Sequence, residues 1–173
     1  MLKLFAVIAV GAAGLVAGLA MAAETDSYKL TANLKARFEV PKPQGVPTGA
    51  TGLFTGTAVE LENDRGRLTW RLTFTKLSGR ATAAHIHAGR VGKAGAVLVA
   101  LCGPCRSGQR GNTRITRAHL RSIRAGRTYV NVHTAKKAAG EIRGQVKASQ
   151  ASGGTTTDPS PPPTETTEPP PYP

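Results

Sequence analysis

The stretch that decides the fold is Ala83-Ala84-His85-Ile86-His87-Ala88-Gly89, together with a second segment about forty residues later, Tyr129-Val130-Asn131-Val132-His133-Thr134. Both segments predict strands in which histidine lies among apolar neighbours. Residues two apart in a strand share a face, so His85 and His87 point the same way, as do Asn131 and His133. If the two strands are neighbours, three of the chain's four histidines converge.

The rest of the domain shows the same short, alternating pattern. Apolar residues recur at every second position from Tyr28 to Val40, which predicts one half-buried strand. Further strands are expected at residues 52–61, 67–76, 82–87, 96–101, 112–115, 128–133 and 141–147. Residues 63–66 carry the turn signal of a hairpin, and Thr116 can cap a short helix over 117–124. This pattern predicts an all-β fold: an antiparallel β-sandwich, immunoglobulin-like or superoxide-dismutase-like in outline, with one short helix.

The two ends of the chain differ from this domain. Residues 1–23 combine Lys3, an apolar run and a small-residue cleavage site, which predicts a secretory signal peptide. An uncleaved membrane anchor is the alternative. Residues 149–173 are rich in Ser, Gly, Thr and Pro, and we expect them to be a disordered tail. The domain is therefore residues 24–148, and the protein is expected to be secreted or associated with the cell envelope.

The charge of the chain is strongly positive, at +13, and it is unevenly distributed. Residues 65–140 hold 16 Lys and Arg and no Asp or Glu. We expect an anionic contact patch at the arginines of the predicted helix and just before it, with an anionic envelope polymer as the partner: Arg114, Arg117, Arg121 and Arg124. The alternatives are an unknown extracellular protein as partner, or a basic surface that only aids solubility. Export argues against nucleic acid, and we expect a monomer.

The His-x-His pair is a known arrangement of metal ligands, because alternate strand residues present two imidazoles to one ion. Neutral imidazole suits copper and zinc, so His85, His87 and His133 form a candidate metal site. The alternative is a buried polar network in which these histidines join Asn131 and Glu141 and fix the strand pairing. Dismutase activity is not expected, since four histidines supply too few ligands for two metals and no aspartate lies in the central region.

The two cysteines lie in Cys102-Gly103-Pro104-Cys105, which has the spacing of a thioredoxin-type active site. The residues that follow are typical of a loop, and a helix at this place is what would lower the thiol pKa. In an exported chain, two cysteines most simply form one disulfide, here between Cys102 and Cys105. No nucleophile or carboxylate constellation stands out, so we expect no enzymatic activity.

Three blocks, in this order and spacing, resemble the chordin-type (CHRD) domain: residues 34–41, residues 84–89, and residues 126–134 with 140–146. The resemblance covers Ser27 to Ala148. It implies an exported β-sandwich, and it defines no biochemical activity. Taken together, these features predict an exported, non-enzymatic CHRD module with a binding or structural role at or outside the cell envelope, through its basic surface. The alternative is a copper- or zinc-binding protein that uses the His-x-His pair and His133.

Overall fold

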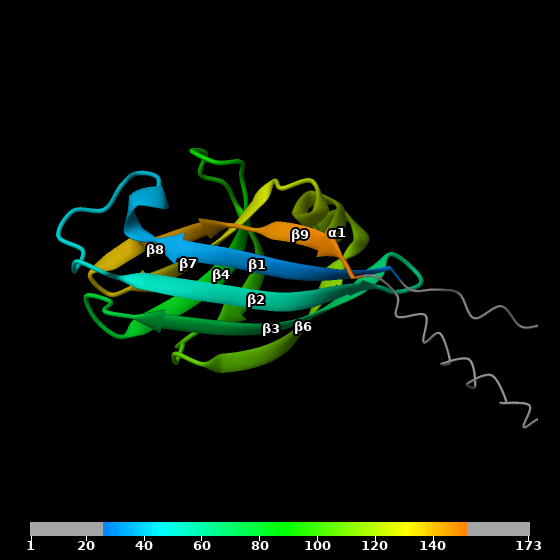
Figure 1. Ribbon diagram of the computed structural model, residues 1–173, viewed down its shortest axis with the longest axis horizontal. Coiled ribbons are helices and arrows are strands. Elements are labelled where there is room, and N and C mark those ends of the chain that lie inside the picture. Colours follow the sequence, from blue (N-terminus) through cyan, green and yellow to red (C-terminus); the bar gives the residue numbers. More distant parts are fainter. Residues whose placement is uncertain (1–25, 152–173) are drawn as a thin grey trace, which may run out of the picture.

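The structure is a computed structural model that describes residues 26–151. The described chain forms nine strands, one short α-helix and one 3-10 turn (Figure 1). The strands are β1 (Ser27–Lys35), β2 (Thr51–Glu60), β3 (Arg65–Thr75), β4 (Ala81–Ala88), β5 (Val97–Cys102), β6 (Gln109–Thr116), β7 (Thr128–Thr134), β8 (Lys137–Gln145) and β9 (Lys147–Gln150). The 3-10 turn η1 covers Ala36–Phe38 and the helix α1 covers Arg117–Arg124.

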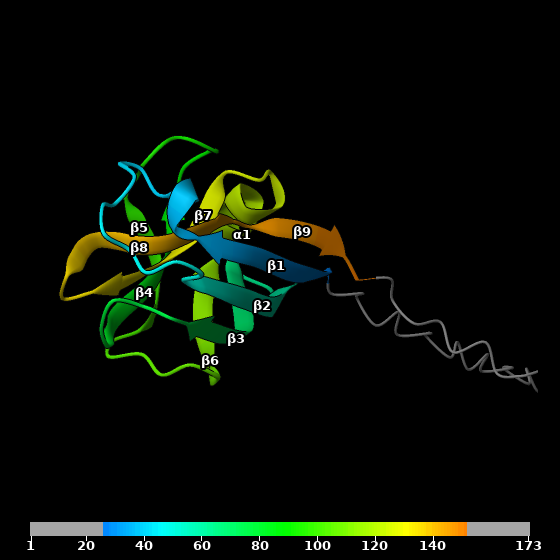
Figure 2. The ribbon, with the colours of Figure 1, turned by 60° about the vertical axis from the view of Figure 1, so that its left-hand side comes forward.

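All strand pairs are antiparallel and belong to one sheet with the order β5-β4-β7-β8-β1-β2-β3-β6, while β9 pairs with β1. Figure 1 shows this sheet curling, so that β4 lies behind β1 and β2, with α1 beside β9, and the turned view of Figure 2 shows β4 and β5 to the left of β1, β2 and β3. The two layers expected for a sandwich are thus two halves of one nearly closed sheet. The predicted all-β class with a single short helix is confirmed.

The core lies between these two halves. Strands β1 to β3 supply large apolar side chains that are fully buried, including Leu30, Leu34, Phe54, Leu68 and Leu72. From the other half come Ile86, Val130, Val132 and Ile142, also fully buried. Inward residues alternate with outward ones, as period-2 strands require. The outward face of β4, β7 and β8 therefore carries His85, His87, Asn131, His133 and Arg143.

The local predictions are largely confirmed. The hairpin of β2 and β3 pairs over its whole length, from Thr51 with Thr75 to Glu60 with Gly66. Helix α1 begins as expected, because the side chain of Thr116 accepts a hydrogen bond from the backbone N–H of His119. Leu120 and Ile123 face inward and are buried.

Two strand boundaries were wrong. The first strand ends at Lys35 rather than Val40, and Phe38, expected on the buried face, is exposed. Lys35 is the last residue of β1 with partners on both sides, Thr51 and Arg143, so the ladder offers nothing to extend it. The last predicted strand is divided: β8 ends at Gln145, and β9 pairs with β1 instead.

The predicted signal peptide lies outside the described residues, and so does nearly all of the predicted tail. In the part of the chain that the structure covers, no helix has both the length and the apolar composition needed to cross a membrane.

Candidate metal centre

Three histidines meet on the outward face of β4 and β7. The antiparallel register places His85 opposite Asn131 and His87 opposite Tyr129, while His133 lies diagonally across from His85, opposite Ala83. One potential ligand nitrogen from each of His85, His87 and His133 lies within 4.8 Å of the other two. The convergence expected from the sequence is therefore present, and it is a direct consequence of this strand register.

Hydrogen bonds to backbone carbonyls orient two of the three rings. His87 donates from Nδ1 to the carbonyl oxygen of Gly95 at 2.9 Å, and His133 donates from Nδ1 to the carbonyl oxygen of Ala138 at 2.9 Å. Because a carbonyl only accepts, Nδ1 of both rings carries a proton, and in the neutral form of each ring the lone pair is on Nε2. Metal-ligating histidines are commonly fixed by such carbonyl partners.

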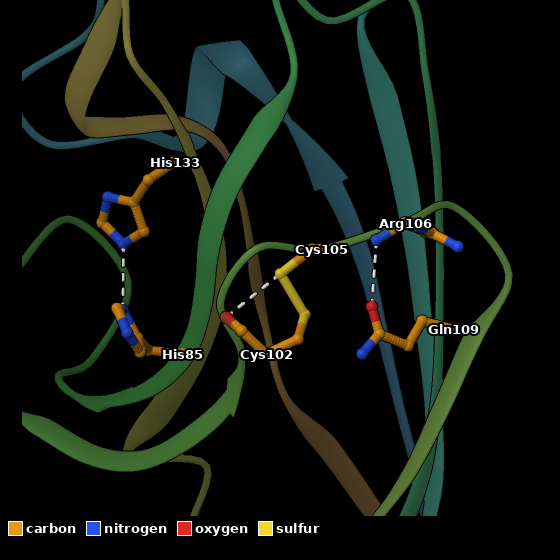
Figure 3. Close-up of a disulfide and its surroundings, with 6 residues drawn as sticks. All are labelled: His85, Cys102, Cys105, Arg106, Gln109 and His133. Atoms are coloured by element: carbon orange, nitrogen blue, oxygen red, sulfur yellow. Dashed lines mark hydrogen bonds between the residues drawn. A yellow bond between two sulfur atoms is a disulfide. The ribbon is translucent and has the colours of Figure 1, made fainter.

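The two presented lone pairs have different surroundings. Nε2 of His87 is buried and has no hydrogen-bond partner. Nε2 of His133 lies 3.2 Å from Nδ1 of His85, which donates its proton to it (Figure 3). Two nitrogens bound to one tetrahedral zinc ion are about 3.3 Å apart. The separation of these two nitrogens is therefore close to that of two ligands of one zinc ion, and the hydrogen bond between them would have to break for a metal to bind.

The protonation of the cluster also favours metal binding. Burial lowers the pKa of His85 below its usual range, and the neighbouring imidazoles of His133 and His87 lower it further. Burial likewise lowers the pKa of His133, although its hydrogen bond to Ala138 opposes this shift. Neutral imidazole is the ligand form, so at neutral pH these rings need not lose a proton to bind.

The cluster is closed on one side and open on the other. The ring of Tyr129 stacks on His87 at a centroid distance of 5.0 Å, and Arg143 stacks on the far face of that tyrosine. His87 is buried, whereas His85 and His133 are half-buried and lie toward solvent. Three imidazoles with one accessible side match a zinc or copper site that keeps a position for water or another ligand.

Asn131 and Glu141 do not join the histidines in one network. The amide of Asn131 lies near Glu39, since a side chain added at Gly140 would touch both. The carboxylate of Glu141 is fully buried and accepts hydrogen bonds from the backbone N–H and hydroxyl of Ser78 and from the hydroxyl of Thr134. The alternative of one polar network is therefore not what the structure shows, since Asn131 lies with Glu39 and Glu141 lies with Ser78 and Thr134.

Cys102 and Cys105 are joined by a disulfide, at the end of β5 and in the loop that follows (Figure 3). Cys105 is buried and its backbone N–H donates to the carbonyl oxygen of Ala81, which is the first residue of β4. The disulfide fixes the loop to the end of β5, and this hydrogen bond holds it against β4, the strand that carries His85 and His87.

Two of the four arginines in the expected anion-binding patch already contact other side chains. Arg117 forms ion pairs with Glu60 at 2.6 Å and with Asp64 at 3.4 Å. The guanidinium of Arg124 lies 4.4 Å from the centroid of the Tyr28 ring. Arg114 and Arg121 are exposed.

Arg114 also belongs to a second group of arginines, which are exposed on the outward face of β3 and β6. Cross-strand pairing places Arg67 opposite Arg114 and Arg71 opposite Arg110. We call these four residues the arginine ladder.

Sequence reasoning missed the residues that orient the cluster. Tyr129 is in the same segment as His133 and two residues before Asn131, so its face could have been assigned. The carbonyls of Gly95 and Ala138 carry no sequence signal, because any residue supplies one.

One comparison with known proteins gives a match. No curated protein and no solved structure matches the chain. The family model of the CHRD domain matches residues 30–146. This range includes all three histidines of the cluster and every strand except the first residues of β1 and the whole of β9. The chain therefore belongs to the CHRD domain family.

Proposed function

We propose that the protein is an exported, non-enzymatic CHRD module that binds one copper or zinc ion through His85, His87 and His133. The observation that carries this proposal is the buried, unpartnered Nε2 of His87, in a cluster where one nitrogen from each of three imidazoles lies within 4.8 Å of the other two. A buried polar atom without a partner destabilises a fold by about 1–3 kcal/mol. A bound metal ion would satisfy this atom and both of its neighbours.

The ligand set favours the metals at the end of the first transition row. Three imidazole nitrogens without a carboxylate suit copper and zinc rather than calcium or magnesium, which prefer oxygen. Affinity for such sites follows the Irving–Williams order, so Cu²⁺ should bind more tightly than Zn²⁺. The accessible side near His85 and His133 leaves room for water or for an exchanging ligand.

The test is elemental analysis of the full protein purified without a histidine tag, followed by calorimetric titration with Cu²⁺ and Zn²⁺. We expect one equivalent of metal. At free metal 100-fold above the dissociation constant, unfolding should cost about 2.7 kcal/mol more, which raises the Tm by roughly 10 °C. Absence of binding at micromolar Cu²⁺ and Zn²⁺ would refute the proposal.

Variants separate the site from non-specific histidine binding. His85→Ala removes a half-buried ligand that does not hold a backbone carbonyl, so the variant should fold and lose most of the affinity. His119→Ala is the matched control, because it removes the fourth histidine, which lies on α1 outside the cluster. Equal losses in the two variants would contradict a defined site.

The arginine ladder favours a second function, the binding of an anionic polymer. Like charges directly opposite each other on neighbouring strands are destabilising. Here two such pairs follow one another without an acidic residue between them: Arg67 with Arg114, then Arg71 with Arg110. The pairs are four residues apart along β3, or about 13 Å. A polymer with regularly spaced anionic groups can contact both pairs and relieve the repulsion in each.

Polyphosphate of defined length is a suitable probe for the ladder. We expect Arg71→Ala/Arg110→Ala to weaken polyphosphate binding and to reduce its salt dependence. The control Lys42→Ala/Arg80→Ala removes the same charge at two exposed positions away from the ladder. If both double variants weaken binding equally, net charge alone explains the affinity and the ladder is not a site.

A further inference from the structure

A pocket of about 400 Å³ lies on the outward face of β1 and β8, apart from the histidine cluster. One wall is η1 and the residues that follow it (the η1 segment, residues 36–40), with Phe38 and Val40, and another is the loop between β4 and β5, with Val91 and Gly92. Most of this lining is apolar, and the volume is within the range of sites that hold small molecules. Phe38 and Val91 are two of the few large apolar side chains exposed in the described chain, and both belong to this pocket.

The polar part of the pocket contains a buried arginine that is held rigidly. Arg143 is 2% exposed, and its Nη2 donates to the carbonyl oxygens of Arg90 at 3.1 Å and Lys93 at 2.8 Å. Its guanidinium lies 3.4 Å from the centroid of the Tyr129 ring. Its Nη1 is buried without a hydrogen-bond partner. Among residues 26–151, Arg143 forms no ion pair.

A buried carboxyl lies beside this arginine. Glu39 is 6% exposed, lines the same pocket, and has an Oε1 without a hydrogen-bond partner. Burial raises the pKa of Glu39 to about 7, although Arg143 on β8, the backbone of Val40 and the Asn131 amide on β7 each oppose the shift. Near neutral pH this side chain is therefore protonated for much of the time and can donate a hydrogen bond.

The charges around the pocket are unbalanced in favour of an anion. Arg37, Arg143 and Lys147 line it, against the single carboxyl of Glu39. A buried guanidinium with a free N–H and no counterion is stabilised by a carboxylate, which is its usual planar partner.

We propose that this pocket binds a small amphiphilic monocarboxylate, an aliphatic chain or a single ring that ends in a carboxylate. The carboxylate accepts a hydrogen bond from Nη1 of Arg143 and a second one from protonated Glu39. The apolar body lies against Phe38, Val40 and Val91. This arrangement satisfies the buried guanidinium and covers the exposed apolar side chains, and neither result depends on a metal at the histidines.

Three probes with the same apolar chain test the head group: octanoate, octan-1-ol and octylamine, each titrated into the full protein by calorimetry. We expect octanoate to bind roughly tenfold more tightly than octanol, because a charge-assisted hydrogen bond to a buried group is stronger than a neutral one. Octylamine should bind most weakly. Octanoate binding no tighter than octanol binding, or a preference for octylamine, overturns the proposal.

Variants locate the probe and test the role of Glu39. Phe38→Ala should weaken octanoate binding, whereas Leu53→Ala should not, although both side chains are 42% exposed and only Phe38 lines this pocket. Octanoate affinity should fall as the pH rises from 6 to 8 in the natural protein, because ionised Glu39 repels the carboxylate. In Glu39→Gln the affinity should stay constant over this range. Equal effects of Phe38→Ala and Leu53→Ala, or the same pH dependence in Glu39→Gln, would refute the assignment.

Discussion

Glu141 should contribute more to stability than any other carboxylate in the described chain, and Glu141→Gln tests this. Its side chain is fully buried on β8 and accepts three hydrogen bonds, two from Ser78 and one from Thr134. Ser78 belongs to the loop between β3 and β4, and Thr134 ends β7. The carboxylate thus connects the hairpin of β7 and β8 to the loop between β3 and β4, which is 63 residues away in the sequence at Ser78.

The magnitude follows from the two donors that share one oxygen. The Ser78 hydroxyl at 2.7 Å and the Thr134 hydroxyl at 2.6 Å both donate to Oε2. In the glutamine variant an amide NH₂ can take this place, and it donates instead of accepting. Each hydrogen bond to a charged group exceeds a neutral one by about 1 kcal/mol, so we expect a loss of about 2 kcal/mol in the free energy of unfolding. Such a loss lowers the Tm by roughly 8 °C.

Urea denaturation measures the effect, followed by the fluorescence of Trp70, the only tryptophan and a buried one. Glu62→Gln is the matched control, since Glu62 is exposed and its substitution should change stability by less than about 0.5 kcal/mol. A change in Glu141→Gln as small as that of the control would show that the buried carboxylate contributes nothing beyond its shape.

Three further predictions concern the neighbouring groups. Gly140→Ala should destabilise the fold by about 2–4 kcal/mol, because the residue has a φ of 132° and an added Cβ would lie 2.5 Å from Oε1 of Glu39. The control is Gly79→Ala, where an added Cβ has nothing within 4 Å, and it should have little effect in the same urea titration. The lowered pKa values of His85 and His133 mean that the unfolded state binds more protons, so metal-free stability should fall as the pH drops below about 6.5, and less so in His85→Ala. Glu39 should change stability with pH in the opposite direction, because its pKa is raised from 4.5 to about 7. The free energy of unfolding should fall by about 3 kcal/mol as the pH rises through that interval, and Glu39→Gln should abolish this part of the pH profile.

Much of the fold was predictable because its signals are local. Alternation over Leu68, Trp70 and Leu72 identifies the buried face of β3, and the turn at residues 63–66 joins it to β2. The N-cap at Thr116 needs only the next three residues to form. Each of these features depends only on residues that are close together in the sequence, so it can be predicted without knowing the fold.

The errors came from information that is not local. Apolar residues continue to alternate beyond Lys35, yet the strand ends there because no partner strand continues beside it. The convergence of the three histidines was predictable from their faces, whereas the pairing of Asn131 with Glu39 was not, because it depends on how the η1 segment folds back over β7 and β8. The arginine ladder depends on the register of β3 with β6, two strands separated by more than thirty residues.

Both proposed small sites arise from one structural feature, the covering of a sheet face that strand alternation would leave to solvent. The outward face of β4, β7 and β8 carries His87, Tyr129 and Arg143, and the ring of Tyr129 stacks with both the His87 imidazole and the Arg143 guanidinium. The loop between β4 and β5 covers them and takes hydrogen bonds from both ends of the stack, at Gly95 from His87 and at Lys93 from Arg143. This loop covers His87 of the candidate metal site on one side and forms a wall of the pocket on the other. The sheet is what the family match covers, and both proposed sites depend on the loop that lies over it.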